Sequence, residues 1–352
     1  MRNENIEKKT NLNILLVGGY PPPIGGITVH IQRLQKYCLD NLIKCYILDT
    51  TKFYRKNKKK SNLIYFLQLN KLLKIWRISD IVHFHVATFR NLLKLYILFL
   101  YFRKKKKIVT IHSGNFKRKF NKMNGMQKYL VKYLLNQTER IITVSKEQKE
   151  VIYEFGQKIF SRIIVVPAYL FPIATKVGLN LQDISKILQN NRTKLLTSGY
   201  LQHYYGYEMI LDFLSSNQNY FGVFVFYGKS DPKYRKKIVS QIDKRENALF
   251  FENLTPESFN WLLKNVEIYV RNTDRDGDCV ALREAAYWGI KTLASNAVRR
   301  PEGVKLFKYN NYDDFGKKMN DVMNESAVKG FVDKTNNAEK ILSVYYDLLQ
   351  EE

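Results

Sequence analysis

The sequence has few cysteines and few acidic residues for its length, and both shortages narrow the possible classes of protein. Its three cysteines among 352 residues, Cys38, Cys45 and Cys279, form no CxxC pair. We therefore expect neither a disulfide framework nor a structural zinc site. Asp and Glu number 32 against 58 Lys and Arg, which gives a formal net charge of +26. Such a charge implies anionic partners: nucleic acid, an acidic membrane or phosphorylated substrates.

Long apolar runs are also missing. The first residues, MRNENIEKKTN, lack the apolar core of a secretory signal, so we expect a protein of the reducing cytoplasm. The most apolar stretch, Phe89–Phe102, is shorter than the ~20 residues that span a bilayer, and it ends in the basic run RKKKK at 103–107. A crossover helix is the simpler interpretation. The alternative is a helix that also touches an anionic membrane with its basic end.

Strand-like apolar runs alternate with helical patterns in both halves of the chain. A hydrophobic content of 45% indicates a globular protein, and the length suggests two domains. We therefore predict two Rossmann-like parallel-sheet α/β domains that face a cleft. Residues 1–170 form the first domain, 171–192 a linker and 193–330 the second domain. Residues 331–352 carry a helix that is expected to pack back on the first domain.

The expected strands and helices follow from the period of the apolar residues. A helix is predicted over Leu63–Trp76 and a helical piece at Ile184–Leu188. The expected strands are Asn13–Val17, Tyr46–Leu48, Ile81–Val86, Ile108–Ile111, Arg140–Val144, Ile163–Val166, Lys194–Ser198, Gly222–Tyr227 and Val266–Val270.

A glycine-rich loop follows the first strand. It begins at Gly18-Gly19, passes three prolines and ends at Gly25-Gly26, before a helix from about Ile27. Glycines let backbone N–H groups approach an anion closely. The loop is neither a GxGxxG motif nor a P-loop, because no Gly-Lys-Ser/Thr follows. A plain loop with a proline bend is the alternative.

Four of the five histidines lie in the first half of the chain. His112 directly follows the strand Ile108–Ile111, and ligands of open parallel sheets bind beyond the carboxyl ends of the strands. His112 is therefore a site candidate. His83 and His85 share one face of a strand, but without a third ligand they predict no metal site. Core or structural roles are favoured for these two and for His30, and we expect no metal and no cofactor.

The stretch from Arg271 to Arg300 holds two candidate carboxylates, Asp276 in a loop and Glu284 in the following helix. Helical side chains lean toward the N-terminus, so both can face one pocket. Asp278 is the expected N-cap and Gly289 the expected C′ residue, and the helix N-terminus suits a phosphate. Two acceptors beside a phosphate site point to a ligand rich in hydroxyls, such as a nucleotide sugar. Capping and turn formation are the alternative roles.

The sequence resembles the group 1 retaining glycosyltransferases of the GT-B fold, which build capsular, exopolysaccharide and lipopolysaccharide chains. The resemblance rests on RNT…DGDCVALREAAYWGIKTLAS…RPEGVKLF in the second half, PPPIGGITVH near the start and the position of His112. It spans nearly the whole chain. It implies an enzyme that uses a nucleotide diphosphate sugar and a saccharide or lipid-linked saccharide acceptor, at the inner face of the cell membrane.

The resemblance also implies roles for single residues. Asp276 and Glu284 stand at the two acidic positions of the family's E-x7-E motif, the first near the donor sugar hydroxyls and the second near the ribose. Gly25 and Gly26 would offer N–H groups to the diphosphate, and His112 would approach the transferred sugar. The implied donor-binding set is Gly25, Gly26, Gly199, Lys229, Arg271, Asp276, Gly277, Asp278, Cys279, Val280 and Glu284.

Two positions depart from the family pattern. The family places basic residues that grip the diphosphate where Tyr200 and Tyr205 stand here. Arg271 and Lys229 are the first candidates to replace that charge, followed by Arg275 and Arg283. Either the diphosphate is held differently, or the donor differs, or activity is weak.

The implied reaction breaks an anomeric C–O bond through an oxocarbenium-like transition state, so positive groups and N–H donors are needed at the leaving phosphate. The resemblance names no side-chain nucleophile and requires no metal. One rival is a catalytically silent GT-B partner subunit that binds lipid-linked saccharide or an active enzyme. Nucleic-acid binding rests on charge alone, since no RRM, KH or helix-turn-helix signature is present.

Overall fold

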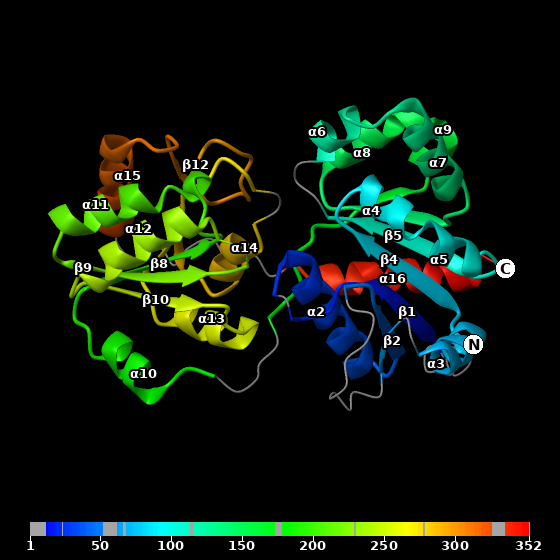
Figure 1. Ribbon diagram of the computed structural model, residues 1–352, viewed down its shortest axis with the longest axis horizontal. Helices are drawn as coiled ribbons and strands as arrows, with labels where there is room; N and C mark the ends of the chain where they lie inside the picture. Colours follow the sequence, from blue (N-terminus) through cyan, green and yellow to red (C-terminus); the bar gives the residue numbers. More distant parts are fainter. Residues whose placement is uncertain are drawn as a thin grey trace. The chain divides into compact units, whose positions relative to one another are not determined.

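The computed structural model describes residues 12–22, 24–51, 62–65, 68–112, 116–172, 178–228, 230–276, 279–325 and 335–351. The chain forms two compact units (Figure 1). Unit 1 comprises Met1–Phe171 and Asn336–Glu352, and unit 2 comprises Pro172–Thr335. The last helix therefore belongs to the unit in which the chain begins.

Unit 1 is built on a seven-stranded sheet with the order β3-β2-β1-β4-β5-β6-β7. All neighbouring strands are parallel. From β1 the chain adds β2 and β3 on one side of the sheet, and from β4 it adds β5, β6 and β7 on the other side. The direction of the connections therefore reverses between β1 and β4. The strands are β1 (Asn13–Gly18), β2 (Lys44–Asp49), β3 (Leu63–Tyr65), β4 (Ile81–Val86), β5 (Lys106–Ile111), β6 (Arg140–Thr143) and β7 (Ile163–Val165).

Alternate side chains of the unit 1 strands enter two separate cores, as a strand period of two requires. Leu15 and Val17 of β1 join the core under α3, α4, α5, α7 and α8. Ile14 and Leu16 join the core under α2 and α16. The helices of this unit are α2 (Gly26–Asp40), α3 (Leu69–Ile78), α4 (Phe89–Lys94), α5 (Tyr96–Tyr101), α6 (Phe116–Asn121), α7 (Gly125–Asn136), α8 (Lys146–Ile152), α9 (Gln157–Phe160) and α16 (Asn337–Gln350).

The C-terminal helix α16 is part of the unit 1 core. Its buried residues Ile341, Tyr345 and Leu348 pack in the same cluster as β1 and β2, and Figure 1 shows the helix (red) along this sheet. The Tyr345 hydroxyl lies 2.6 Å from Nδ1 of His83, and Lys106 Nζ donates to the Leu348 carbonyl at 2.6 Å. These contacts fasten the end of the chain to β4 and β5.

Unit 2 is built on a six-stranded parallel sheet with the order β10-β9-β8-β11-β12-β13. Counted within the unit this is the order 3-2-1-4-5-6 of a dinucleotide-binding fold, with its reversal between β8 and β11. The strands are β8 (Thr193–Gly199), β9 (Tyr220–Phe226), β10 (Ala248–Glu252), β11 (Ile268–Arg271), β12 (Lys291–Ser295) and β13 (Lys305–Phe307).

Helices cover both faces of the unit 2 sheet. One core lies under α11, α12 and α15, and the other under α10, α13 and α14. The helices are α10 (Leu181–Leu188), α11 (Tyr207–Ser216), α12 (Pro232–Asp243), α13 (Pro256–Lys264), α14 (Val280–Tyr287) and α15 (Tyr312–Asn324). The predicted pair of parallel-sheet α/β domains is confirmed.

Capping residues explain where several helices begin. Ser145 caps α8, as predicted, and its side chain accepts from the Gln148 N–H. Asp231 and Thr255 cap α12 and α13, and in both helices proline occupies the first turn. Proline suits that position because its missing N–H would have no partner inside the helix.

Two predicted elements differ from the structure. The segment predicted as a helix over Leu63–Trp76 begins with the edge strand β3, whose Leu63 pairs with Ile47 of β2, and the helix starts only at Leu69. Pairing with a neighbouring strand overrides the local helical pattern there. The stretch predicted as one helix from Phe89 is two, α4 and α5, which meet at Leu95.

The helical piece predicted at Ile184–Leu188 is confirmed and begins three residues earlier, as α10. It lies in the predicted linker but buries Ile187 completely in a unit 2 core, so this part of the linker belongs to unit 2. α6 was not predicted. Across the described segments, helix length and hydropathy fall short of what a membrane-spanning helix requires.

Candidate functional site

The reversal of strand order in unit 2 brings Gly199 and Arg271 to adjacent strand ends. β8 ends at Gly199 and β11 at Arg271, and the two strands pair through Thr197 and Val270. The chain leaves these two ends in opposite directions, which opens a crevice at the carboxyl edge of such sheets. The segments that follow them therefore form the candidate site of unit 2.

Tyr205 fills the space that glycine leaves at the end of β8. A Cβ on Gly199 would lie 2.1 Å from the Tyr205 ring, so no side chain fits without moving that ring. Tyr205 is buried and stacks on Tyr207 with ring centroids 5.8 Å apart. Burial raises the pKa of Tyr205 to about 12, although Arg271 opposes the shift. The side chain is therefore a neutral phenol at the position where a basic residue was expected.

Tyr200 is at the surface. Its side chain is 41% exposed, and its ring lies beside Gly228, where a Cβ would come within 2.6 Å of it. Tyr200 and Tyr205 thus differ in role: the first can meet a ligand and the second packs the floor of the site.

Arg271 turns inward from the end of β11. Its Nε and Nη2 donate to the two carboxylate oxygens of Asp276 at 2.8 and 2.9 Å. Nη1 donates to the Ser198 carbonyl, and Nη2 also reaches the Tyr205 hydroxyl at 3.3 Å. The guanidinium carbon lies 4.7 Å from the centre of the Tyr205 ring. Arg271 is thus buried, and each of its three side-chain nitrogens donates a hydrogen bond within the protein.

Arg300 is a second guanidinium in this network, and sequence reasoning gave it no role. Its Nη1 donates to Asp276 Oδ2 at 2.8 Å, and its Nη2 donates to the Thr273 carbonyl and to Ser295 Oγ. The side chain is only 1% exposed. It stands in the RPEGV segment of the sequence motif, which was the only signal for it. A separation of 24 residues from Asp276 gave no local pattern to read.

Two guanidiniums surround one carboxylate in this network. Burial favours a raised pKa for Asp276, but the charges and hydrogen bonds of Arg271 and Arg300 outweigh it and hold the pKa below its usual value. Asp276 is therefore ionised. Three of its roughly four acceptor sites are taken by the two arginines, which leaves capacity for one further donor.

Glu284 belongs to a different hydrogen-bond network. It is buried in α14, and its Oε1 accepts from Asn260 Nδ2 of α13 at 3.1 Å. The Asn260 Oδ1 in turn accepts from Trp288 Nε1 at 2.8 Å. The nearby Tyr227 has a pKa raised by burial first and by the Glu284 charge second. Glu284 is held in a defined position by groups that leave it a carboxylate acceptor.

Helix α14 begins one residue later than expected. Cys279, not Asp278, is the N-cap, and its side chain makes no capping hydrogen bond. Burial raises the pKa of Cys279 to about 11, so it is no thiolate nucleophile. Gly289 follows the C-cap Trp288 with a φ of 69°, as the predicted C′ glycine should. Val280 opens the helix, whereas Lys229, Gly277 and Asp278 lie outside the described residues.

Arg275 is the exposed cation of the same loop. Its side chain is 53% exposed and pairs with Asp274 at 3.4 Å. The guanidinium lies 4.6 Å from the centre of the Tyr204 ring. Arg275 can therefore approach an anionic ligand, whereas Arg271 is already neutralised by Asp276.

The reversal point of unit 1 carries the other predicted residues. Gly25 caps α2, and its N–H donates to Thr28 Oγ1 at 2.9 Å, while Gly26 is the first helical residue. A Cβ on Gly26 would meet nothing within 4 Å, so its surroundings are open. The His112 N–H donates to the Val86 carbonyl at 2.9 Å, which places the ring just beyond β4 and β5.

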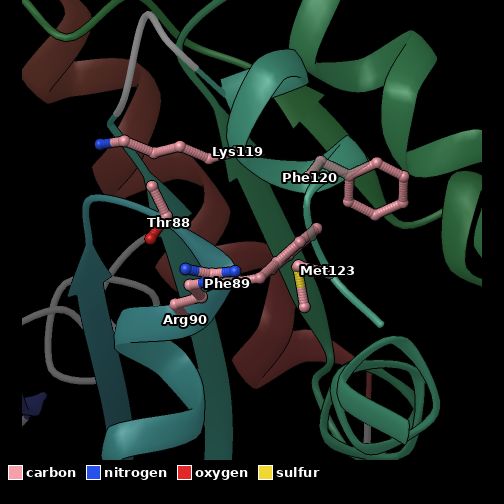
Figure 2. Close-up of a pocket in the computed structure, with 6 residues that line it drawn as sticks. All are labelled: Thr88, Phe89, Arg90, Lys119, Phe120 and Met123. Atoms are coloured by element: carbon pink, nitrogen blue, oxygen red, sulfur yellow. The ribbon is translucent and has the colours of Figure 1, made fainter. Parts of the chain in front are cut away.

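A small recess lies elsewhere in unit 1 (Figure 2). It is open to solvent and has no room for a molecule the size of water, and its lining residues are Thr88, Phe89, Arg90, Lys119, Phe120 and Met123. Ligand pockets usually measure ~300–1,000 Å³. The recess is too small for a nucleotide sugar and contains none of the predicted site residues.

The fold and these two strand-end sites define a protein of two dinucleotide-binding-type domains, the architecture of GT-B glycosyltransferases. Residues 24–168 match the family model Glycosyltransferase Family 4. A search of curated proteins found no match.

Solved structures of glycosyltransferases share the architecture over nearly the full chain. HepE from Anabaena, in complex with UDP and glucose, is 12% identical with a TM-score of 0.65, over 97% of this chain and 100% of that one. Sucrose-phosphate synthase from Thermosynechococcus elongatus is 12% identical with a TM-score of 0.66, over 97% and 100%. WaaG, a glycosyltransferase of lipopolysaccharide biosynthesis, is 10% identical with a TM-score of 0.60, over 90% and 92%. At these identities the likeness establishes the fold.

Proposed function

We propose that the protein is a retaining glycosyltransferase that moves a sugar from a nucleotide diphosphate sugar to a saccharide acceptor. The observation that carries the proposal is the reversal point of unit 2, where a buried carboxylate, Glu284, and an exposed guanidinium, Arg275, lie on the segments that follow β11. A carboxylate accepts from hydroxyls, and a guanidinium stabilises a phosphate. The family match of residues 24–168 and the HepE complex with UDP and glucose support the same reaction.

In this proposal Glu284, Asp276 and His112 keep the roles expected for them. Glu284 accepts from the ribose hydroxyls. Asp276 uses its remaining acceptor capacity for a donor sugar hydroxyl, while Arg271 and Arg300 hold it in place. His112 approaches the transferred sugar from unit 1. Arg275 takes over part of the charge that the family's basic pair supplies, because Tyr200 and Tyr205 carry none.

The chemistry follows from where charge develops. As the anomeric C–O bond breaks, negative charge grows on the leaving phosphate, and Arg275 and backbone N–H groups are the groups that stabilise it there. The same phosphate helps to deprotonate the acceptor hydroxyl on the same face, so the anomeric configuration is retained. The acceptor is proposed to be a lipid-linked saccharide of bacterial surface polysaccharide synthesis, and the transfer requires no metal.

Turnover of a panel of nucleotide diphosphate sugars tests this function. We expect hydrolysis or transfer with at least one donor, retention of the anomeric configuration in the product, and undiminished rates in EDTA. Nuclear magnetic resonance of the first-formed product reads the configuration. Failure with every donor, together with binding of a lipid-linked saccharide, would instead support the catalytically silent partner subunit.

We also propose that unit 1 associates with an anionic membrane surface at the inner face of the cell membrane. Met126, Tyr129 and Tyr133 lie along one face of α7 and are 74%, 70% and 43% exposed. The exposed Lys132 lies on the same helix. Apolar side chains beside basic ones suit an anionic bilayer, to which each Lys or Arg adds ~1 kcal/mol.

Sedimentation with lipid vesicles tests the membrane proposal. We expect binding to vesicles with anionic lipid, little binding to zwitterionic vesicles, and weaker binding of the double variant Met126→Ser, Tyr129→Ser. Leu306→Ser is the matched control, because Leu306 is a similarly exposed apolar residue of unit 2, at 45%. Equal binding of all variants would remove α7 from the contact.

A further inference from the structure

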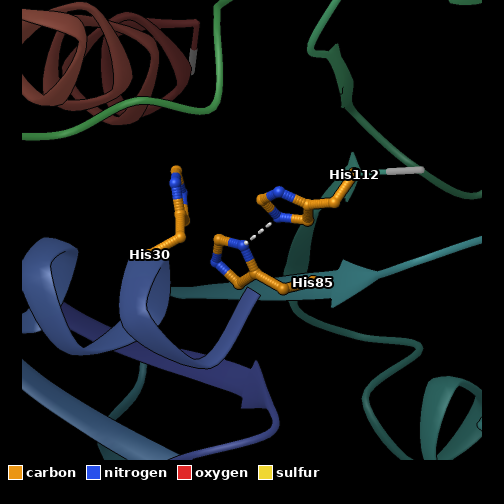
Figure 3. A group of neighbouring side chains, drawn as sticks. All are labelled: His30, His85 and His112. Atoms are coloured by element: carbon orange, nitrogen blue, oxygen red, sulfur yellow. Dashed lines mark hydrogen bonds between the residues drawn. The ribbon is translucent and has the colours of Figure 1, made fainter. Parts of the chain in front are cut away.

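Three histidines from separate elements converge at the reversal point of the unit 1 sheet. His30 lies on α2, which follows β1, His85 lies on β4, and His112 directly follows β5. β1, β4 and β5 are consecutive neighbours in the sheet. Figure 3 shows the three rings turned toward a common point.

The spacing of the ring nitrogens suits one small cation. One ring nitrogen of each histidine lies within 4.8 Å of those of the other two. The Nδ1 of His85 and the Nε2 of His112 are 3.1 Å apart and share a hydrogen bond (Figure 3), whose proton a bound metal ion would replace. Two nitrogens on one tetrahedral zinc, each at about 2.0–2.1 Å, are ~3.3 Å apart. Small ring rotations therefore bring the three nitrogens to ligand distance.

The hydrogen bond of His30 fixes which of its nitrogens is available. Its Nδ1 donates to the Ala168 carbonyl at 2.7 Å, so the proton is on Nδ1 and Nε2 carries a bare lone pair. His30 is only 3% exposed, and within the described residues its Nε2 has no partner. A histidine that binds a metal through one ring nitrogen usually donates the N–H of its other ring nitrogen to an acceptor such as a backbone carbonyl.

His85, on strand β4, is also a buried histidine with a ring nitrogen that is unpartnered in the described part of the chain. It is 4% exposed, and its Nε2 likewise has no partner among the described residues. Buried polar atoms without partners are rare and need an explanation. Two such nitrogens within one cluster indicate a place for a polar ligand or an ion.

His83 differs from the other three histidines of unit 1. Its Nδ1 and Nε2 each lie 2.6 Å from a hydroxyl, that of Tyr345 and that of Thr110. Both nitrogens are thus used, and the ring packs against His85 with centroids 4.0 Å apart. His83 is therefore not part of the ligand set.

We propose that His30, His85 and His112 bind one divalent transition-metal ion, with Zn²⁺ the best fit. Neutral imidazoles suit Zn²⁺, Co²⁺ and Ni²⁺, whereas Mg²⁺ and Ca²⁺ prefer oxygen ligands. The site shares His112 with the proposed glycosyl transfer, which itself requires no metal. It is a binding site in unit 1 whose occupancy can be measured without any activity.

Direct titration of the full chain tests the site. After treatment with EDTA and its removal, competition with a chromophoric zinc indicator should give one tight Zn²⁺ per chain, with no competition by Mg²⁺ or Ca²⁺. Co²⁺ should give the strong visible absorption of a tetrahedral site. A stoichiometry near zero, or Zn²⁺ displaced equally well by Mg²⁺, would overturn the proposal.

Histidine variants locate the ion. His112→Ala and His30→Gln should each weaken Zn²⁺ binding by more than ~100-fold, which exceeds the ~10–100-fold effect of losing an outer partner. His203→Ala is the matched control, because His203 lies in unit 2 with its side chain 71% exposed. Circular dichroism without metal checks the fold of each variant, and Zn²⁺ should raise the melting temperature of the wild type and of His203→Ala only. Unchanged affinity in both cluster variants would contradict the assignment.

Discussion

Replacing Arg271 with methionine is expected to lower the free energy of unfolding of unit 2 by about 3 kcal/mol. Removing one partner of a buried ion pair typically costs about 3–5 kcal/mol. The lower end applies because Arg300 still neutralises Asp276. Methionine keeps most of the side-chain volume. The lost free energy of unfolding therefore measures the contribution of the charge and of the hydrogen bonds to Asp276, Ser198 and Tyr205.

Urea unfolding followed by tryptophan fluorescence can isolate this effect. Of the three tryptophans, Trp261 and Trp288 lie in unit 2 and Trp76 in unit 1. A Trp76→Phe background therefore makes the signal specific for unit 2. Arg275→Met in the same background is the control, because this arginine is 53% exposed and its loss should change stability by less than about 0.5 kcal/mol.

The pH dependence separates an ionic effect from a loss of packing. The pKa of Asp276 is lowered in the folded protein, so its contribution to stability is complete above its unfolded pKa of about 3.9 and is lost as the pH falls through the lowered value. The stability difference between wild type and Arg271→Met should therefore shrink at low pH. A difference that stays constant down to pH 2, or a variant as stable as the Arg275→Met control, would contradict the buried network.

Replacing Glu284 with glutamine is expected to reduce kcat/KM for the nucleotide-sugar donor by about 10- to 150-fold. A hydrogen bond to a charged group contributes ~1.5–3 kcal/mol, and ~1.4 kcal/mol corresponds to a factor of ten in rate. Glutamine keeps an acceptor oxygen for Asn260, so the network with Trp288 and the fold should persist. The measurement is steady-state turnover of the donor identified in the panel.

Two further variants sharpen the test of Glu284. Glu246→Gln removes the same charge from an exposed turn of unit 2 and should leave turnover unchanged. Glu284→Ala removes the acceptor altogether and should lose at least as much activity as the glutamine variant. If Glu284→Ala turns over as fast as wild type, Glu284 lies outside the donor site and the assignment of unit 2 as the donor domain loses its main support.

The results of these two experiments are independent. Arg271 acts by holding Asp276 and the loop around it, so its loss should appear first in stability. Glu284 is held by Asn260, and glutamine keeps that contact, so its replacement should appear in turnover without a matching loss of stability. Coincident effects of both substitutions on stability alone would favour a silent binding subunit.

Most of the architecture could be predicted from local pattern. The run Ile81–Val86 has the predicted bounds, because a buried parallel strand carries its signal within a few residues. The edge strand β3 could not be predicted in this way. Its three residues become a strand only because β2 lies beside them.

The candidate site was less predictable than the fold. The loop of Asp276 and the helix of Glu284 were located from the sequence, but not the partners that determine their chemistry. Arg271 was expected to face the diphosphate, yet its charge is used by Asp276 inside the protein. Arg300 had no signal beyond the RPEGV motif, because it meets Asp276 only in the folded chain. The grouping of His30 with His85 and His112 had no signal, because the three residues lie on separate elements.

The sequence by itself therefore determined the two parallel sheets, since the period of the apolar residues dictates which segments form strands and which faces are buried. Only the tertiary structure decided which side chains meet at the carboxyl ends of those sheets. The physical reason is that the strand order, 3-2-1-4-5-6 in unit 2, arises from packing between segments far apart in the chain. That order places Arg271 against Asp276 and Arg300, and it brings His30, His85 and His112 together around one point.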